Sequence, residues 1–150
     1  MTSITWQKKH FKDLSIKELY KLMALRQEVF IVEQDCPYLD ADEWDFDCHH
    51  LLAYPQLDEL GAYARIVPPK VCFEEVSIGR ILTASTYRGT GLGKKLMQES
   101  FAYVKHLYGD VPIRIAAQYY LLNFYEGFGF KQVSSLYLED MIPHVEMVRA

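Results

Sequence analysis

Three of the chain's eight glycines fall within five positions, in the segment 87–94, which reads Tyr-Arg-Gly-Thr-Gly-Leu-Gly-Lys. An apolar run at 76–83 precedes this segment and predicts a strand, and apolar residues at helical spacing follow it. A strand that leads through a glycine turn into a helix leaves backbone N–H groups without partners at the start of the helix. With the helix dipole and the nearby cations Arg88 and Lys94, these groups predict a site for a phosphate or pyrophosphate.

The spacing of the glycines excludes two common nucleotide loops. A P-loop has the pattern G-x-x-x-x-G-K-[ST], but Gly93-Lys94 is followed by Lys95, and Arg88 stands where the first glycine belongs. A dinucleotide fingerprint has the pattern G-x-G-x-x-G, but Lys94 occupies the position of the third glycine. The next predicted strand, 113–117, also ends without a carboxylate that could bind a ribose.

The remaining pattern is R-x-x-G-x-G, formed by Arg88, Gly91 and Gly93, and it resembles the acyl-CoA-binding loop of the GNAT family of N-acyltransferases. A second motif about 30 residues later, at 117–130, resembles the late helix of that family, with Tyr125 followed by Gly127-Phe128. Gln118 stands where many members have asparagine. The segments 25–38 and 139–147 resemble the ElaA-type subgroup, so the resemblance covers nearly the whole chain.

The resemblance implies that acetyl-CoA is the acyl donor, and no metal-binding spacing of cysteines and histidines stands in the sequence, so we expect no metal. In the family, the loop amides bind the pyrophosphate of coenzyme A, and the backbone of the preceding strand binds the pantetheine arm. It implies the following cofactor-binding residues in this chain: Ile81, Leu82, Thr83, Arg88, Gly89, Thr90, Gly91, Leu92, Gly93, Lys94 and Gln118.

Strands and helices alternate along the chain without a linker or repeat, which predicts one domain over residues 1–150 with an α+β fold. The sequence pattern predicts a mixed, mostly antiparallel sheet of six to seven strands flanked by helices. The family resemblance implies that the central parallel strands, 76–83 and 113–117, splay apart. The other predicted strands are 4–8, 50–54, 61–67, 130–138 and 144–149, and the predicted helices run from Asp13 or Ser15 to about 33, from 89 to 108, and from 119 to 128.

Composition and charge exclude several classes of function. No apolar run approaches 18 residues, and the first residues lack the pattern of a secretory signal, so we expect no membrane span. The three cysteines are odd in number and widely spaced, which is typical of a reducing compartment and indicates a cytoplasmic protein. The formal net charge of −4 argues against a nucleic-acid partner.

Tyr125 is the candidate catalytic residue, as the general acid of an acyl transfer. A phenol with an ordinary pKa near 10 is protonated at neutral pH and can give its proton to a departing thiolate. The alternative is an ordinary helix aromatic, because Phe124 and Phe128 flank Tyr125.

The sequence leaves the general base open. Carboxylates and histidines that could accept a proton from an alkylammonium substrate are Glu33, Glu75, His50, Glu139 and His144.

Two polar segments allow both a functional and a structural interpretation. Six carboxylates between positions 35 and 47 could steer a cationic amine or could simply form a solvated loop. Cys48-His49-His50 suggests a metal site, but neighbouring residues of a strand point to opposite faces, so we expect no metal there.

These observations favour an acyl-CoA-dependent N-acyltransferase that transfers acetyl from acetyl-CoA to a primary amine by direct attack. The acceptor could be a small molecule or a peptide, and a homodimer would cover open sheet edges. The alternatives are a non-catalytic acyl-CoA-binding module on the same fold and an acyltransferase of the homoserine-lactone-synthase type. The acceptor amine, the acyl-chain preference and the oligomeric state are not readable from the residues.

Overall fold

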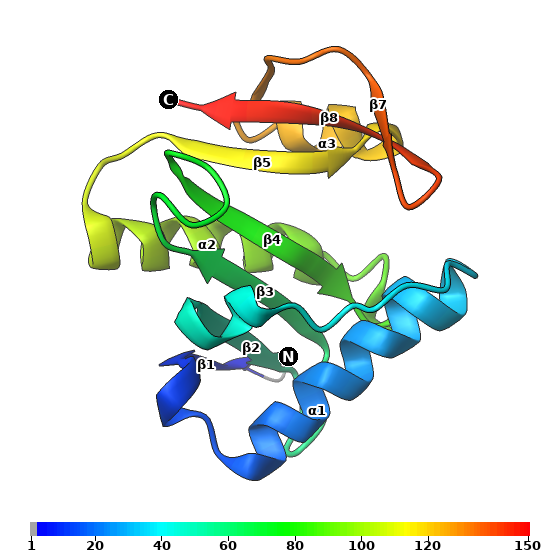
Figure 1. The fold of residues 1–150 in the computed structure, drawn as a ribbon. Helices are drawn as coiled ribbons and strands as arrows, with labels where there is room; N and C mark the ends of the chain where they lie inside the picture. The colour runs from blue at the N-terminus through cyan, green and yellow to red at the C-terminus, as the bar shows by residue number, and fades with distance from the viewer. Residues whose placement is uncertain (1–2) are drawn as a thin grey trace.

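An eight-stranded sheet forms the centre of the structure, a computed structural model that describes residues 3–150 (Figure 1). The strands lie in the order β1-β2-β3-β4-β5-β8-β6, and β7 pairs with β8 beside this path. Only β4 and β5 run parallel among these pairings, which confirms the predicted mixed, mostly antiparallel sheet. The strands are β1 Thr5–His10, β2 His49–Tyr54, β3 Ala62–Val67, β4 Val76–Thr83, β5 Ile113–Gln118, β6 Lys131–Gln132, β7 Tyr137–Glu139 and β8 Ile142–Arg149.

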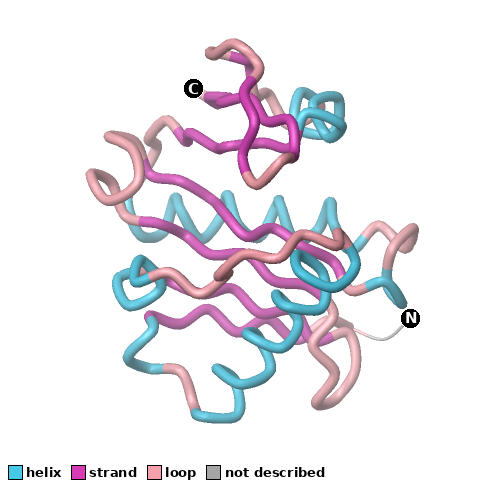
Figure 2. The backbone as a smooth tube through the Cα atoms, turned by 45° about the vertical axis from the view of Figure 1, so that its right-hand side comes forward, coloured by secondary structure: helices cyan, strands magenta, loops and turns pink. Residues whose placement is uncertain are grey.

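Two long helices cover opposite faces of the sheet, as Figures 1 and 2 show together. Helix α2, Leu92–Tyr108, packs its apolar face against one side of the sheet, where Leu51 of β2 is buried. Helix α1, Ile16–Arg26, packs on the other side, against Leu52. Leu51 and Leu52 are neighbours that point to opposite faces, as alternation along a strand requires. None of the helices within residues 3–150 is both long and apolar enough to cross a bilayer.

Helix α1 begins at a capping box and changes its geometry before it ends. Of the two predicted caps, Ser15 is the one used: its hydroxyl accepts a hydrogen bond from the Glu18 N–H at 3.0 Å, and the Glu18 carboxylate accepts one from the Ser15 N–H at 2.8 Å. The predicted helix does extend to Glu33, but its last part, Gln27–Glu33, is π-helical. Such wider turns are rare and occur often at functional sites.

Two predicted helices differ from those in the structure. Gly89 and Gly91 have left-handed φ angles of 79° and 86°, which a right-handed helix cannot contain, so α2 starts at Leu92 rather than at position 89. The predicted helix 119–128 divides into a 3₁₀ turn, Tyr119–Leu121, and a short helix α3, Leu122–Glu126.

The predicted strand 130–138 is also wrong, because it is interrupted between β6 and β7. The Ser134 hydroxyl accepts a hydrogen bond from the backbone N–H of Glu146 at 2.8 Å, in a position where a continuous strand would offer a carbonyl. Serine side chains compete with main-chain ladders in this way. The interruption adds a strand, and the sheet therefore has eight strands instead of six or seven.

The sheet splits between its two parallel strands. β4 and β5 pair only at Val76 with Ile113 and at Ser77 with Arg114, and beyond these positions the strands diverge (Figure 1). This confirms the predicted splay. β4 is irregular on its other side too, because its register with β3 shifts near Arg65 and Arg80 has a φ of 47°.

Candidate active site

A cavity of about 1300 Å³ lies where β4 and β5 diverge. Its wall includes β4, the end of β5, the glycine turn before α2, the π-helical segment and the β7–β8 hairpin. Pockets for small ligands usually occupy 300–1000 Å³, so this one has room for a large ligand or for two ligands side by side.

The glycine turn forms one end of the cavity. Gly89, Gly91, Gly93 and Lys94 all line it. Gly91 is the N-cap of α2 and has no side chain that could bind the first N–H groups of the helix. Space is also open around Gly89 and Gly91, because an added Cβ atom at either position would meet nothing within 4 Å. Free amides at a helix start in open space suit an anion.

Arg88 lines the same end of the cavity but already has partners. Its Nη2 lies 2.6 Å from a carboxylate oxygen of Glu33, and its Nε–H donates a hydrogen bond to the carbonyl of Thr83 at 3.0 Å. The guanidinium is about half exposed, with 47% of its side chain accessible. A phosphate that binds Arg88 must therefore share this cation with Glu33 or replace Glu33.

The end of β4 provides an unpaired strand edge along the cavity. Ile81, Leu82 and Thr83 line the cavity. At this level β4 still pairs with β3 on one edge, but β5 has diverged, so the other edge of β4 has no strand partner. An unpaired edge of this kind can bind an extended amide chain through main-chain hydrogen bonds.

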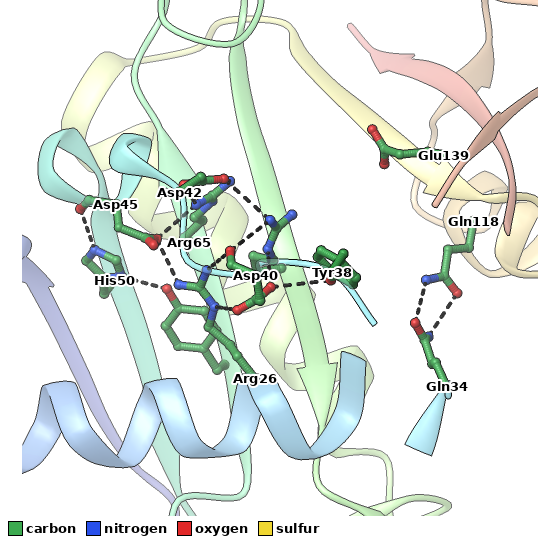
Figure 3. A network of polar contacts seen from close by, with 12 residues as sticks. Arg26, Gln34, Tyr38, Asp40, Asp42, Asp45, His50, Arg65, Gln118 and Glu139 are labelled. Carbon is green, nitrogen blue, oxygen red and sulfur yellow. Dashed lines mark hydrogen bonds and ion pairs between the residues drawn. The ribbon is translucent and has the colours of Figure 1, made fainter. Parts of the chain in front are cut away.

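Two of the predicted cofactor-binding residues do not line the cavity. Leu92 is only 3% exposed, and its side chain belongs to the apolar core under α2. The Thr90 hydroxyl donates a hydrogen bond to the carbonyl of Tyr87 at 2.5 Å and thereby closes the turn. Gln118 does line the cavity, and its amide contacts that of Gln34 across the cleft at 3.3 Å (Figure 3).

Tyr125 on α3 lines the cavity and is 5% exposed. Burial raises the pKa of its phenol well above the ordinary value of 10. Tyr125 is therefore protonated at neutral pH and can act as a proton donor. The structure brings it into the same cavity as the glycine turn.

Sequence reasoning missed a buried cluster of charges beside the cavity (Figure 3). Arg26, which is fully buried, lies 2.8 Å from Asp40 and 2.8 Å from Asp45. Burial raises the pKa of Asp45, but the hydrogen bonds and charges of Arg26 and Arg65 outweigh this effect and hold its pKa below the ordinary value.

Two further arginines complete this cluster. Arg65 lies 2.6 Å from Asp42 and 2.8 Å from Asp45, and Arg80 lies 2.8 Å from Asp40. The carboxylates of Asp40 and Asp45 are buried against arginines and form neither a solvated loop nor a steering surface, whereas Asp42 is bound to Arg65 and also lines the cavity. The sequence did contain a signal for this cluster. Arg65 and Arg80 lie in predicted strands, and burial of an isolated charge there would be too costly without a partner of opposite charge.

The structure separates the five candidate bases. His50 is fully buried, its Nδ1 accepts from the hydroxyl of Tyr63 at 2.6 Å, and its Nε2–H donates to the carbonyl of Asp45 at 3.1 Å. Glu75 is bound to Arg114 at 3.0 Å, and neither His50 nor Glu75 lines the cavity.

The other three candidate bases line the cavity. Glu33 is bound to Arg88 at the end that holds the glycine turn. Glu139 and His144 belong to the β7–β8 hairpin, where the carboxylate lies 3.5 Å from the imidazole Nε2.

The segment Cys48-His49-His50 does not converge on one point. The His49 ring lies 2.9 Å from the hydroxyl of Tyr103 on α2, whereas the His50 ring lies against Tyr63 on the other face of the sheet. Residues 3–150 contain no group of three or more His, Cys, Asp or Glu side chains placed to hold a metal.

Comparison with known proteins places the chain in a family. The sequence pattern described as the Acetyltransferase (GNAT) domain matches residues 46–150. Protein ElaA of Escherichia coli strain K12 is 43% identical over 148 residues, which cover 97% of this chain and 96% of ElaA. The fold is similar to a crystal structure of an acyl-CoA N-acyltransferase from Pseudomonas aeruginosa, with a TM-score of 0.94, 44% identity and coverage of 99% and 100%.

A more distant likeness concerns the fold alone. A GNAT family acetyltransferase from Elizabethkingia anophelis, with acetyl-CoA bound, has a TM-score of 0.65 at 16% identity, over 97% of each chain. The domain match and the full-length identity to ElaA confirm the predicted resemblance. The chain belongs to the GNAT acetyltransferase family.

Proposed function

We propose that the protein transfers acetyl from acetyl-CoA to a primary amine, by direct attack of the amine on the thioester. The observation that carries this proposal is the split in the sheet, which brings the glycine turn, the unpaired edge of β4 and Tyr125 into one cavity. The cavity also has room for an acceptor beside the donor. The distant relative from Elizabethkingia anophelis has acetyl-CoA bound on the same fold.

In this proposal, each part of the donor meets a matching part of the cavity. The amides of Gly89, Gly91 and Gly93 and the side chains of Arg88 and Lys94 bind the pyrophosphate. The unpaired edge from Ile81 to Thr83 binds the pantetheine amides, and one of its N–H groups polarises the thioester carbonyl. A single donor of this kind contributes roughly 3 kcal/mol to transition-state stabilisation.

The chemistry then needs one proton donor on the leaving group. The amine nitrogen attacks the carbonyl carbon, the C–N bond forms, and the C–S bond breaks. The departing thiolate takes the proton of Tyr125, and the phenolate regains a proton from the nitrogen of the new amide. Tyr125 is suited to this role because it lines the cavity and its phenol is protonated at neutral pH.

The role of Arg88 can be tested by calorimetry with acetyl-CoA. Arg88→Glu places a carboxylate beside Glu33 at the proposed pyrophosphate site, and we expect it to abolish binding. Lys105→Glu makes the same charge change near the other end of α2, outside the cavity, and should leave binding intact. An Arg88→Glu protein that binds acetyl-CoA as the wild type does would contradict the proposed site.

The role of Tyr125 can be tested by steady-state kinetics. Tyr125→Phe should lower turnover by about 10²-fold or more and leave the affinity for acetyl-CoA nearly unchanged, because only a transition-state interaction is lost. Tyr119→Phe, at an exposed position outside the cavity, is the matched control. If turnover survives the loss of the Tyr125 hydroxyl, the general-acid role is wrong.

The acceptor can be found by a screen of amines that follows the release of free thiol. Binding of acetyl-CoA without thiol release from any amine would instead support a non-catalytic acyl-CoA-binding module. We place the protein in the cytoplasm as part of the same proposal. Its three cysteines, Cys36, Cys48 and Cys72, are free thiols, which supports a reducing compartment.

A further inference from the structure

We propose that His144 is the general base that takes the proton of the acceptor ammonium, and that Glu139 positions the acceptor and holds the charged imidazole. This inference rests on the proposed amine acylation and deepens it, because it assigns the acceptor end of the cavity. It selects one of the five candidate bases from the contacts that the fold gives each of them.

His144 lies on β8 at the point where three strands meet. It pairs with Gln118 of β5 on one side and with Tyr137 of β7 on the other. Directly opposed residues of antiparallel strands lie on the same face. His144 and Gln118 both line the cavity, and α3 with Tyr125 follows Gln118 in the chain after a single 3₁₀ turn. The imidazole therefore lies in the same cavity as the proposed general acid.

The hydrogen bonds of His144 define its tautomer. Nδ1 lies 2.7 Å from the carbonyl oxygen of Ile142, and a carbonyl oxygen can only accept, so Nδ1 carries a proton. In the neutral ring, Nε2 is then an acceptor with a lone pair. The residue is 94% buried by area, since only 6% of it is exposed, so its ring is held in place by its surroundings.

Nε2 faces a second acceptor. The Oε2 atom of Glu139 lies 3.5 Å from Nε2, which is longer than a hydrogen bond. Two hydrogen-bond acceptors that face each other repel, unless a cation lies between them and donates to both. A primary ammonium has three donors and can satisfy both atoms at once. After the ammonium gives a proton to Nε2, the resulting imidazolium lies beside the same carboxylate. The carboxylate therefore stabilises the positive charge both before and after the proton transfer.

The surroundings of the His144 ring contain few other charges. The Tyr137 ring stacks against it at 6.0 Å between centroids, and the neutral amide of Gln118 lies opposite. Glu146, two positions along β8, is bound to Arg114 at 2.9 Å. Asp140 follows Glu139 and also lines the cavity, so this end of the cavity is acidic and attracts a cation.

None of the other candidate bases combines a place in the cavity, a free proton-accepting atom and burial. Glu33 is bound to Arg88 at the glycine-turn end, Glu75 is bound to Arg114, and His50 has both ring nitrogens in hydrogen bonds inside the core. Glu139 on its own is 55% exposed at its side chain, where water weakens its effect on a proton transfer.

The proton balance closes with these groups. The ammonium gives one proton to Nε2 of His144, and the free amine attacks the thioester. The thiolate leaves with the proton of Tyr125, which regains one from the amide nitrogen. His144 then releases its proton to water, so the reaction yields an amide, a thiol and one proton.

The first test compares two acceptors with different needs for a base. An alkylamine is protonated at neutral pH, whereas the alkoxyamine of the same chain is already neutral. With His144→Gln, we expect turnover of the alkylamine at neutral pH to fall at least about 100-fold and to recover as the pH rises toward the pKa of the amine, while turnover of the alkoxyamine stays nearly constant. An equal loss for both acceptors would overturn the proposal.

Matched variants separate this role from a structural one. Glu139→Gln should raise the KM for the alkylamine and lower its kcat, and Glu126→Gln, an exposed glutamate on α3 outside the cavity, should change neither. His106→Gln is the control for removal of a histidine, because His106 is exposed on α2. Unchanged alkylamine kinetics in Glu139→Gln would remove Glu139 from the site.

The second test does not depend on any acceptor. Spectra of the ¹⁵N-histidine-labelled protein, assigned with His144→Gln and recorded under conditions where the ring is neutral, should show the proton of His144 on Nδ1. A proton on Nε2 would overturn the base assignment even if the enzyme acetylates amines. If no amine of either kind is acetylated but the Nδ1 tautomer is found, the proposed function fails while the geometry of the pair stands.

Discussion

Arg26, Arg65 and Arg80 show that charged residues of this chain serve the fold as well as the site. Each is bound to aspartates of the segment between α1 and β2, and Arg26 is fully buried. Burial of ion pairs has a large desolvation cost, so such pairs persist only when both partners remain. The cluster holds this segment against the wall of the cavity, which Asp42 and Arg80 line.

Removal of one cation from this cluster should therefore destabilise the protein strongly. Arg26→Met leaves Asp40 and Asp45 buried with fewer partners, and we expect the free energy of unfolding in urea to fall by about 3–5 kcal/mol. Lys17→Met removes an exposed ion pair and should change the unfolding midpoint little. A small effect of Arg26→Met would mean that the aspartates find other partners or water.

His50 makes the stability of the protein depend on pH. Burial lowers the pKa of His50 from the ordinary value of 6.5 to about 4. Between pH 6.5 and 4, the unfolded chain therefore binds a proton at this histidine and the folded protein does not. The free energy of unfolding should fall as the pH falls through this window, by up to about 3 kcal/mol. Burial lowers the pKa of His49 too, which acts in the same direction.

The contribution of His50 can be isolated by His50→Gln. The variant should be less stable above pH 6.5, because its contacts with Tyr63 and Asp45 change, but its stability should depend less on pH between 6.5 and 4. Asp45 acts in a separate window, since its lowered pKa matters only below its ordinary value of 3.8. Equal pH slopes for both proteins would show that His50 is not the titrating group.

At the scale of elements, the glycine turn joins β4 to α2 and sets where the helix starts. Gly91 needs its left-handed φ of 86°, whereas Gly93 lies within the first turn of the helix with an ordinary φ. A Cβ atom at Gly93 would lie 3.6 Å from the Thr83 Oγ1, an ordinary contact. The backbone conformation therefore requires glycine at position 91 but not at position 93.

Alanine substitution should separate these reasons. Gly91→Ala forces a left-handed conformation on an alanine and should lower the free energy of unfolding by roughly 1–2 kcal/mol. Gly93→Ala should keep or slightly raise stability, by about 0.5–1 kcal/mol, because alanine favours the helix. Thermal unfolding of both variants measures the difference, and equal losses would contradict the assigned backbone roles.

At the scale of the whole molecule, the two parts of the sheet are joined along β4 and β5 by only two residue pairs. A donor that fills the split would replace the missing pairs. Acetyl-CoA at 100 times its dissociation constant should raise the free energy of unfolding by about 2.7 kcal/mol.

Hydrogen exchange would locate this stabilisation. The backbone amides of Ile81 and Thr83 should become protected when acetyl-CoA binds, because they gain hydrogen-bond partners. The amides of β1 and β2, far from the split in the strand order, are the internal control. Protection spread evenly over the sheet would argue against binding at the unpaired edge of β4.

Much of this protein could be read from local patterns. The alternation of strands and helices, the glycine turn after β4 and a cap at Asp13 or Ser15 follow from residue types at fixed spacing, because hydrophobic periodicity and turn chemistry act over a few residues. The prediction that this turn binds a phosphate rests on the same kind of local pattern. The family resemblance, carried by Arg88, Gly91, Gly93 and Tyr125, implied the splayed sheet that the structure has.

Tertiary structure alone decided which polar side chains meet. Arg88 with Glu33, Arg26 with Asp40, and His144 with Glu139 are pairs that come together through packing of distant elements or through the strand register. Hydrophobic spacing does not encode these contacts, since they depend on how helix ends, loops and a hairpin are placed against one another. The sequence by itself therefore determined most of the elements and the glycine turn at one end of the cavity, and the fold decided which polar side chains meet at the other end.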